Sequence, residues 1–340
     1  MTAPRDTPEA RLSPTRALPR TRPAWFLVAA LIAGLLPLGL SDDYAVHLAV
    51  AIGINAIIVL GLNLLMGYAG QVSLGQAAFV GVGAYAAAIL GTKLGGHISP
   101  WLAMLAGVLL SAAIAAVVGV PLLRLRGHYL AMGTLGFGMI VHIVMVQWEG
   151  LTTGTTGISG FRPLSIAGVS LDTETRMYYL VAVSVLLVLA MASNIINSRV
   201  GRAMRAVHTS EPAAGTSGVD ISRYKLQVFV ISAAFAGLAG GLYAHHAGYV
   251  NPDSFGFGYS IQLVVMVVIG GMASIWGAIF GAGSVTLLGE YLRSRQELSP
   301  VIFGLVLMAA MVLLPDGLWR GAANALSRLR SRRRPESEAS

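Results

Sequence analysis

Long uncharged apolar segments alternate with short polar ones along most of this sequence. Ten segments contain no Asp, Glu, Lys or Arg, although several are shorter than the roughly 20 apolar residues that one membrane-spanning helix needs. The expected spans cover residues 25–40, 45–66, 74–91, 101–120, 129–147, 177–195, 228–247, 259–272, 275–289 and 300–314. The pattern predicts an all-α polytopic membrane protein with about ten spans and at least eight.

The polar residues divide the chain into three expected parts. Residues 1–24 form an N-terminal segment, residues 25–315 form the membrane domain, and residues 316–340 form a basic tail that is expected to be disordered. The first span with its upstream arginines also has features of a secretory signal, but an uncleaved helix is favoured in a polytopic protein. One long internal polar loop, residues 196–226, interrupts the membrane domain.

The positions of the basic residues predict the orientation of the chain. Most of the 23 Arg and Lys residues fall in four groups, at residues 5–22, 124–126, 199–225 and 320–334. Basic loops stay on the cytoplasmic side of a membrane, so both termini are expected to be cytoplasmic. The formal net charge of +8 is then explained by basic residues in cytoplasmic loops and termini, which contact anionic lipid headgroups. No nucleic-acid partner is expected.

Composition narrows the possible chemistry. Hydrophobic residues make up 55% of the chain and charged residues only 11%, whereas soluble domains carry about 25% charged residues. The absence of cysteine excludes disulfides, thiolate metal sites and cysteine nucleophiles. A phosphate-binding loop ends in Gly-Lys-Ser/Thr. Neither lysine of this chain fits that pattern, because Lys93 follows Thr92 and Lys225 follows Tyr224 rather than a glycine. ATP would therefore have to be bound by another polypeptide.

Few ionisable side chains lie inside the expected spans. Ion-coupled carriers usually need such groups within the bilayer, and the spans contain no carboxylate. His142 and the adjacent pair His245 and His246 are the ionisable residues singled out in these spans, but a packing role is favoured for such histidines. The pattern argues against an ion-driven carrier, an intramembrane metalloprotease or a paired-acid enzyme, and no catalytic or metal-binding residue is assigned.

The 196–226 loop has the features of two short helices. Arg202 and Arg205 stand three residues apart beside small and apolar residues, which predicts an amphipathic helix. Thr209 or Ser210 can then cap a second helix. This loop is either an ordinary interfacial segment or a docking element for a partner protein. In a docking element, the small residues Ala213, Ala214 and Gly218 would let the partner approach closely. Glu211 would interact with the helix dipole or pair with a basic group of the partner. The residues assigned to docking are Arg202, Arg205, Glu211, Ala213, Ala214 and Gly218.

Residues 61–79 combine glycines with amide and hydroxyl side chains inside an apolar run. Gly67, Gly70 and Gly75 predict a break in the helix, and irregular backbone at membrane depth must be packed in protein or line a cavity. The segment is expected to line or shape a translocation path, the alternative being a hydrogen-bonded packing motif. The candidate path residues are Asn63, Gln71, Ser73, Gln76, Thr134 and Ser232.

Several stretches resemble one transporter family. The Glu-x-Ala-Ala sequence followed by glycine in residues 211–218 is similar to the coupling loop of ABC importer permeases. Residues 61–79, 124–135 and 267–277 resemble the branched-chain amino acid permeases of the LivH/LivM type, and the LivM type more closely. The resemblance covers roughly residues 45–320. One departure is Gly215, where such loops often carry a better helix former.

The resemblance implies a permease-like helical bundle in the inner or plasma membrane. It also implies a second, LivH-like permease, two ABC ATPases that hold ATP-Mg, and an extracytoplasmic solute-binding protein, with no cofactor on this chain. Solutes in such a family include leucine, isoleucine and valine, other amino acids, and urea or short amides. The competing interpretation is a stand-alone channel or carrier for a small polar solute such as urea or an amide, and a structural membrane protein is a more distant one.

Overall fold

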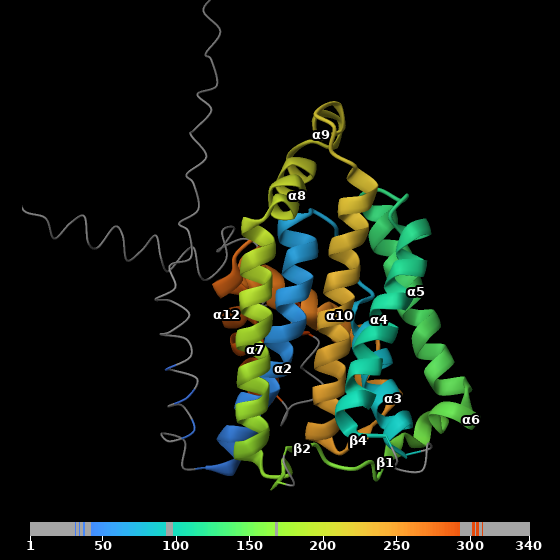
Figure 1. Cartoon of the computed structure of the whole chain (residues 1–340), viewed down its shortest axis with the longest axis vertical. Helices are drawn as coiled ribbons and strands as arrows, with labels where there is room; N and C mark the ends of the chain where they lie inside the picture. The colour runs from blue at the N-terminus through green and yellow to red at the C-terminus, as the bar shows by residue number, and fades with distance from the viewer. Residues whose placement is uncertain are drawn as a thin grey trace, which may run out of the picture.

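A computed structural model describes residues 42–92, 98–166 and 169–292, together with a few isolated positions near each end. Within these ranges the fold is a bundle of long helices that run mostly side by side (Figure 1). The long helices are α2 (Asp43–Asn63), α3 (Gln76–Thr92), α4 (Pro100–Leu122), α5 (His128–Gln147), α7 (Glu174–Asn197), α10 (Ile221–Ala247), α11 (Phe257–Gly270) and α12 (Ile275–Leu292).

Short elements occupy the two ends of the bundle. The helices α8 (Arg199–Thr209) and α9 (Glu211–Thr216) project from one end, and α6 (Glu149–Thr152) lies at the other (Figure 1). Two antiparallel pairs of two-residue strands also lie at the α6 end, namely β1 (Ile158–Ser159) with β4 (Tyr249–Val250) and β2 (Ser165–Ile166) with β3 (Val169–Ser170). The remaining turns are a π-helical turn η1 (Leu64–Tyr68) and the 3₁₀ turns η2 (Gly154–Thr156) and η3 (Pro252–Phe255).

The helical class is confirmed, and the described ranges contain a helix at each of the eight expected spans that fall within them. In the described ranges, seven helices are long and apolar enough to cross a membrane, and α3, with 17 residues, is apolar but shorter. The expected spans 25–40 and 300–314 lie outside the described residues except for isolated positions. Several expected spans are shorter than the helices that contain them: α10 begins at Ile221 rather than residue 228, because a helix can carry Arg223 and Lys225 in its first turns at the membrane surface.

Helix α10 lies against α2, α3 and α4 and forms the centre of the described bundle. Glycines let the backbones approach closely, as in other membrane bundles. A Cβ at Gly83 of α3 would lie 2.3 Å from the carbonyl oxygen of Gly237 in α10. A Cβ at Gly270 of α11 would lie 2.0 Å from the carbonyl oxygen of Gly277 in α12. Larger side chains at these contacts would force the helices apart.

Two interruptions of the helical backbone lie beside each other inside the bundle. Helix α2 continues into the π-helical turn η1, and residues 69–75 then run without regular structure before α3 begins. The second interruption, residues 271–274, separates α11 from α12. A Cβ at Gly67 would lie 2.2 Å from the backbone nitrogen of Ala273, so the two interruptions are in direct contact.

Candidate functional site

Asn63 joins the two interruptions through its side-chain amide. Its Nδ2 donates a hydrogen bond to the carbonyl oxygen of Ser274 at 2.7 Å, and its Oδ1 accepts one from the backbone N–H of Ala273 at 2.9 Å. Ala273 has a positive φ of 57°, a conformation that is uncommon for a residue with a Cβ. Asn63 is only 2% exposed, and its amide pairs the N–H of Ala273 and adds a second hydrogen bond to the carbonyl oxygen of Ser274, which also accepts from the N–H of Ala278 at 3.1 Å.

The 69–75 segment is tied to neighbouring helices by further hydrogen bonds near its end. The backbone N–H of Leu74 donates to Oγ1 of Thr134 in α5 at 3.0 Å. Gln76 Nε2 donates to both the carbonyl oxygen and Oγ of Ser232 in α10, each at 3.0 Å. Asn63, Gln76, Thr134 and Ser232 are therefore held in hydrogen bonds within the fold, which favours a positioning role for these four candidates.

The side chains of Gln71 and Ser73 differ from the other candidates in having no hydrogen-bond partner among the described residues. They are 3% and 2% exposed, yet neither amide atom of Gln71 nor Oγ of Ser73 is paired. Leaving a buried polar group unsatisfied costs about 1–3 kcal/mol. These atoms are the buried side-chain donors and acceptors of residues 69–75 that the described structure leaves unpaired.

The expected pair of short helices, α8 and α9, is present at the end of the bundle opposite the β-strands (Figure 1). Oγ of Ser198 caps α8 by accepting from Val200 N at 3.1 Å, and Gly201, Met204 and Val207 form its buried face. Arg202 is exposed and Arg205 is half-buried, as expected for an amphipathic helix. Ser210, rather than Thr209, caps α9 by accepting from Ala213 N at 3.4 Å. These residues confirm the local structure that the sequence predicted.

The structure corrects two details of the expected docking surface on α9. Glu211 forms its ion pair with Lys225 of α10, so the basic partner of this carboxylate lies within the chain. Ala214 is 4% exposed and packs inward, whereas Ala213 is exposed and faces solvent. Gly218 is exposed with a positive φ of 79°, so its conformation requires glycine independently of any partner.

A cleft of about 750 Å³ opens beside α9. Four basic side chains line it, together with the carboxylates of Glu211 and Asp220. The basic residues come from the turn between α4 and α5 and from the start of α10; they are Arg124, Arg126, Arg223 and Lys225. The excess of positive charge suits an acidic surface.

Helix α8 connects α9 to the interrupted segment. A Cβ built on Gly70 would lie 2.9 Å from Cδ2 of His208, so this imidazole ring rests against the 69–75 segment. Gly70 has a positive φ of 68°, and both the ring and the backbone conformation favour glycine there. His208 is three residues from the start of α9, so α8 spans the distance between α9 and the break.

Comparison with known proteins identifies the family. A family model described as the branched-chain amino acid transport system permease component matches residues 44–311. This match covers most of the chain and both interruptions. The chain belongs to this permease family. It is thus a multi-pass membrane protein and a permease component of a transport system with more than one subunit.

Relatives of this family differ in their degree of similarity. The LivM permease of the high-affinity branched-chain amino acid transport system of Salmonella typhimurium is 34% identical over 316 residues, covering 86% of this chain and 74% of LivM. The LivH permease of the same organism is 26% identical over 77% of this chain and 90% of LivH. The ribose import permease RbsC of Escherichia coli is 25% identical over 86% of this chain and 90% of RbsC. No solved structure matches this chain.

Proposed function

We propose that this chain is the LivM-like permease subunit of an ATP-driven importer for branched-chain amino acids in the bacterial inner membrane. The observation that carries the proposal is the placement of α8 between the exposed α9 and the interrupted 69–75 segment. The family match and the 34% identity to LivM support both the transport role and the amino-acid class. In this assignment α8 and α9 face the cytoplasm, in agreement with the basic residues around them.

The proposed complex contains a second, LivH-like permease, two ATPases that bind ATP-Mg, and an extracytoplasmic solute-binding protein. The α9 surface, defined here as the exposed residues Pro212, Ala213 and Thr216, docks on an ATPase. Movement of α9 passes through α8 and His208 to residues 69–75, which exposes Gln71 and Ser73 to the path. Because these groups are uncharged, their contacts with solute are weak, and the binding protein supplies most of the selectivity.

Purification from native membranes tests this assignment against a stand-alone channel. An affinity-tagged copy of the chain is isolated in mild detergent, and the co-purifying subunits are identified by mass spectrometry. We expect a second permease and ABC ATPases in stoichiometric amounts. A homo-oligomer that contains no ATPase and conducts urea or a short amide in liposomes would favour the channel interpretation instead.

Cysteine accessibility tests the role of Gln71 and Ser73 in the path. The chain has no native cysteine, so Gln71→Cys and Ser73→Cys each introduce a single thiol. Both positions are buried in the described conformation, and we expect protection at rest and at least tenfold faster labelling by a small water-soluble thiol reagent during ATP-driven transport. The labelling rate is measured by mass spectrometry of the complex in proteoliposomes.

Gln76→Cys provides the matched control for this experiment. Gln76 is 1% exposed and lies in the same region, but its amide is held by Ser232. We expect its thiol to stay protected in every transport state. Equal labelling of all three thiols, or no labelling of Gln71→Cys and Ser73→Cys during transport, would contradict the assignment of these two residues to the path.

A further inference from the structure

A cluster of two histidines and one glutamate lies at the end of the bundle opposite α8 and α9. It consists of His47 in α2, Glu174 at the start of α7 and His246 near the end of α10. One ligand atom from each of the three side chains lies within 4.8 Å of those of the other two. Among residues 42–92, 98–166 and 169–292, this is the one group of three or more His, Cys, Asp or Glu side chains that is so compact. The cluster brings together three helices that are distant in sequence.

The spacing of the donor atoms matches a small four-coordinate metal ion. His47 Nδ1 lies 3.0 Å from Glu174 Oε1, and His246 Nδ1 lies 3.7 Å from Glu174 Oε2. Zinc bonds of about 2.0–2.1 Å in tetrahedral geometry place neighbouring ligand atoms roughly 3.3 Å apart. The two observed distances go to different oxygens of Glu174 and lie on either side of this value, and all three donors lie within 4.8 Å of one another, so the side chains would have to close around an ion to share it.

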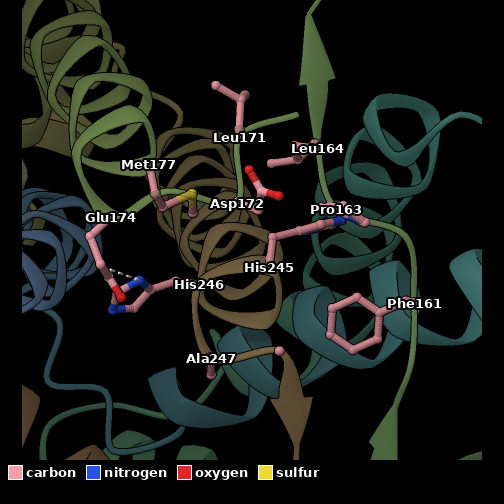
Figure 2. Close-up of a pocket in the computed structure, with 11 residues that line it drawn as sticks. Phe161, Pro163, Leu164, Leu171, Asp172, Glu174, Met177, His245, His246 and Ala247 are labelled. Atoms are coloured by element: carbon pink, nitrogen blue, oxygen red, sulfur yellow. Dashed lines mark ion pairs between the residues drawn. The ribbon is translucent and has the colours of Figure 1, made fainter. Parts of the chain in front are cut away.

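The cluster also contains polar atoms that the protein itself leaves unpaired. The side chain of His246 is only 6% exposed; its Nδ1 faces Glu174, and among the described residues neither its other ring nitrogen, Nε2, nor Oε2 of Glu174 has a hydrogen-bond partner. Both residues line a cavity of about 200 Å³ that also contains Asp172. Figure 2 shows His246 turned toward Glu174, while the adjacent His245 points away from it toward Phe161 and Pro163.

We propose that His47, Glu174 and His246 form a binding site for a divalent transition-metal ion, with Zn²⁺ the best match. Two imidazoles and one carboxylate are a donor set that suits zinc, whereas Ca²⁺ and Mg²⁺ prefer sets made of oxygen atoms. The cavity beside Glu174 and His246 is large enough to hold a water molecule as the fourth ligand. The bound ion would cross-link α2, α7 and α10 at the face opposite the ATPase-docking helices, a role that the transport assignment does not include.

Metal titration of the full-length chain tests this site. The chain is purified in detergent with a tag that contains no histidine, stripped with a chelator, and titrated with Co²⁺ and then Zn²⁺. We expect one equivalent of Co²⁺ to produce the visible absorption of a four-coordinate ion, and Zn²⁺ to displace it. His246→Gln and Glu174→Gln should each weaken binding at least tenfold, because even the loss of an outer-shell partner costs roughly 10–100-fold in metal affinity.

His245→Gln is the matched control, since His245 is the neighbouring histidine of α10 but bonds the carbonyl oxygen of Gly241 in its own helix. We expect this variant to bind Co²⁺ like the wild type. His246→Cys should bind again and add a cobalt–thiolate charge-transfer band, which would place the ion at position 246. Zn²⁺ should raise the thermal unfolding temperature of the wild type but not of His246→Gln. Absence of saturable Co²⁺ binding, or unchanged binding in His246→Gln, would overturn the proposal.

Discussion

Replacing Ala213 with tryptophan is expected to lower solute-stimulated ATP hydrolysis by the reconstituted importer at least tenfold, with membrane insertion unchanged. Ala213 is an exposed small residue of α9, and its backbone N–H already donates to the capping Oγ of Ser210. An indole ring here would separate α9 from an ATPase groove without disturbing the buried Ala214. A tenfold loss corresponds to about 1.4 kcal/mol, a small part of the energy of a docked interface. ATP hydrolysis is measured in proteoliposomes with and without the loaded binding protein.

Ala113→Trp is the matched control for this substitution. Ala113 is also an exposed alanine, but it lies in the middle of α4, away from α9. We expect it to leave stimulated hydrolysis within about twofold of the wild type, since a factor of two is only about 0.4 kcal/mol. Gly218→Trp is a less informative variant, because the positive φ at Gly218 would strain any side chain. Normal stimulation and normal ATPase co-purification in Ala213→Trp would remove α9 from the docking surface.

Substituting Asn63 by alanine should destabilise the folded chain by roughly 1–3 kcal/mol, because the backbone N–H of Ala273 would lose its hydrogen-bond partner at the interruption between α11 and α12. The carbonyl oxygen of Ser274 would lose the bond from Asn63 but keep the one from the backbone N–H of Ala278. The free energy of unfolding is measured by denaturant titration in mixed micelles.

Asn55→Ala supplies a comparison on the same helix. The side chain of Asn55 also takes part in two hydrogen bonds, donating to the hydroxyl of Thr286 and accepting from the hydroxyl of Tyr259. Both bonds are between side chains, whereas those of Asn63 are to backbone groups. Interhelical side-chain hydrogen bonds in membrane proteins average about 0.6 kcal/mol each, so we expect a loss of roughly 1 kcal/mol. An equal loss in the two variants would show that the bonds to the interrupted backbone carry no special weight.

Features that depend on neighbours in the sequence were predictable. Uncharged apolar segments identified the helical membrane class, and the glycines of residues 61–79 identified the break in the helix. The capping residue Ser210 and the alternation of Arg202 and Arg205 with buried residues identified α9 and α8. In each case the signal is a local rule of helix capping, periodicity or backbone freedom, which requires no knowledge of the tertiary fold.

Features that depend on contacts between distant segments were not predictable. The roles of Asn63 and Gln76 depend on partners more than 150 residues away, and nothing near Glu211 indicates that Lys225 will neutralise it. His208 was not selected at all, because its contact with Gly70 exists only in the folded chain. His47 was likewise overlooked within the expected span 45–66, and its neighbours Glu174 and His246 come from other helices.

ATP-driven uptake tests the central claim most directly. The chain is reconstituted into liposomes with its permease partner and the ATPases, and radiolabelled leucine, isoleucine or valine is supplied with the binding protein. The account predicts accumulation above the external concentration only when ATP-Mg reaches the side that carries α8 and α9, and no flux through this chain alone. Equilibration of solute through this chain alone, with no dependence on ATP, would contradict it.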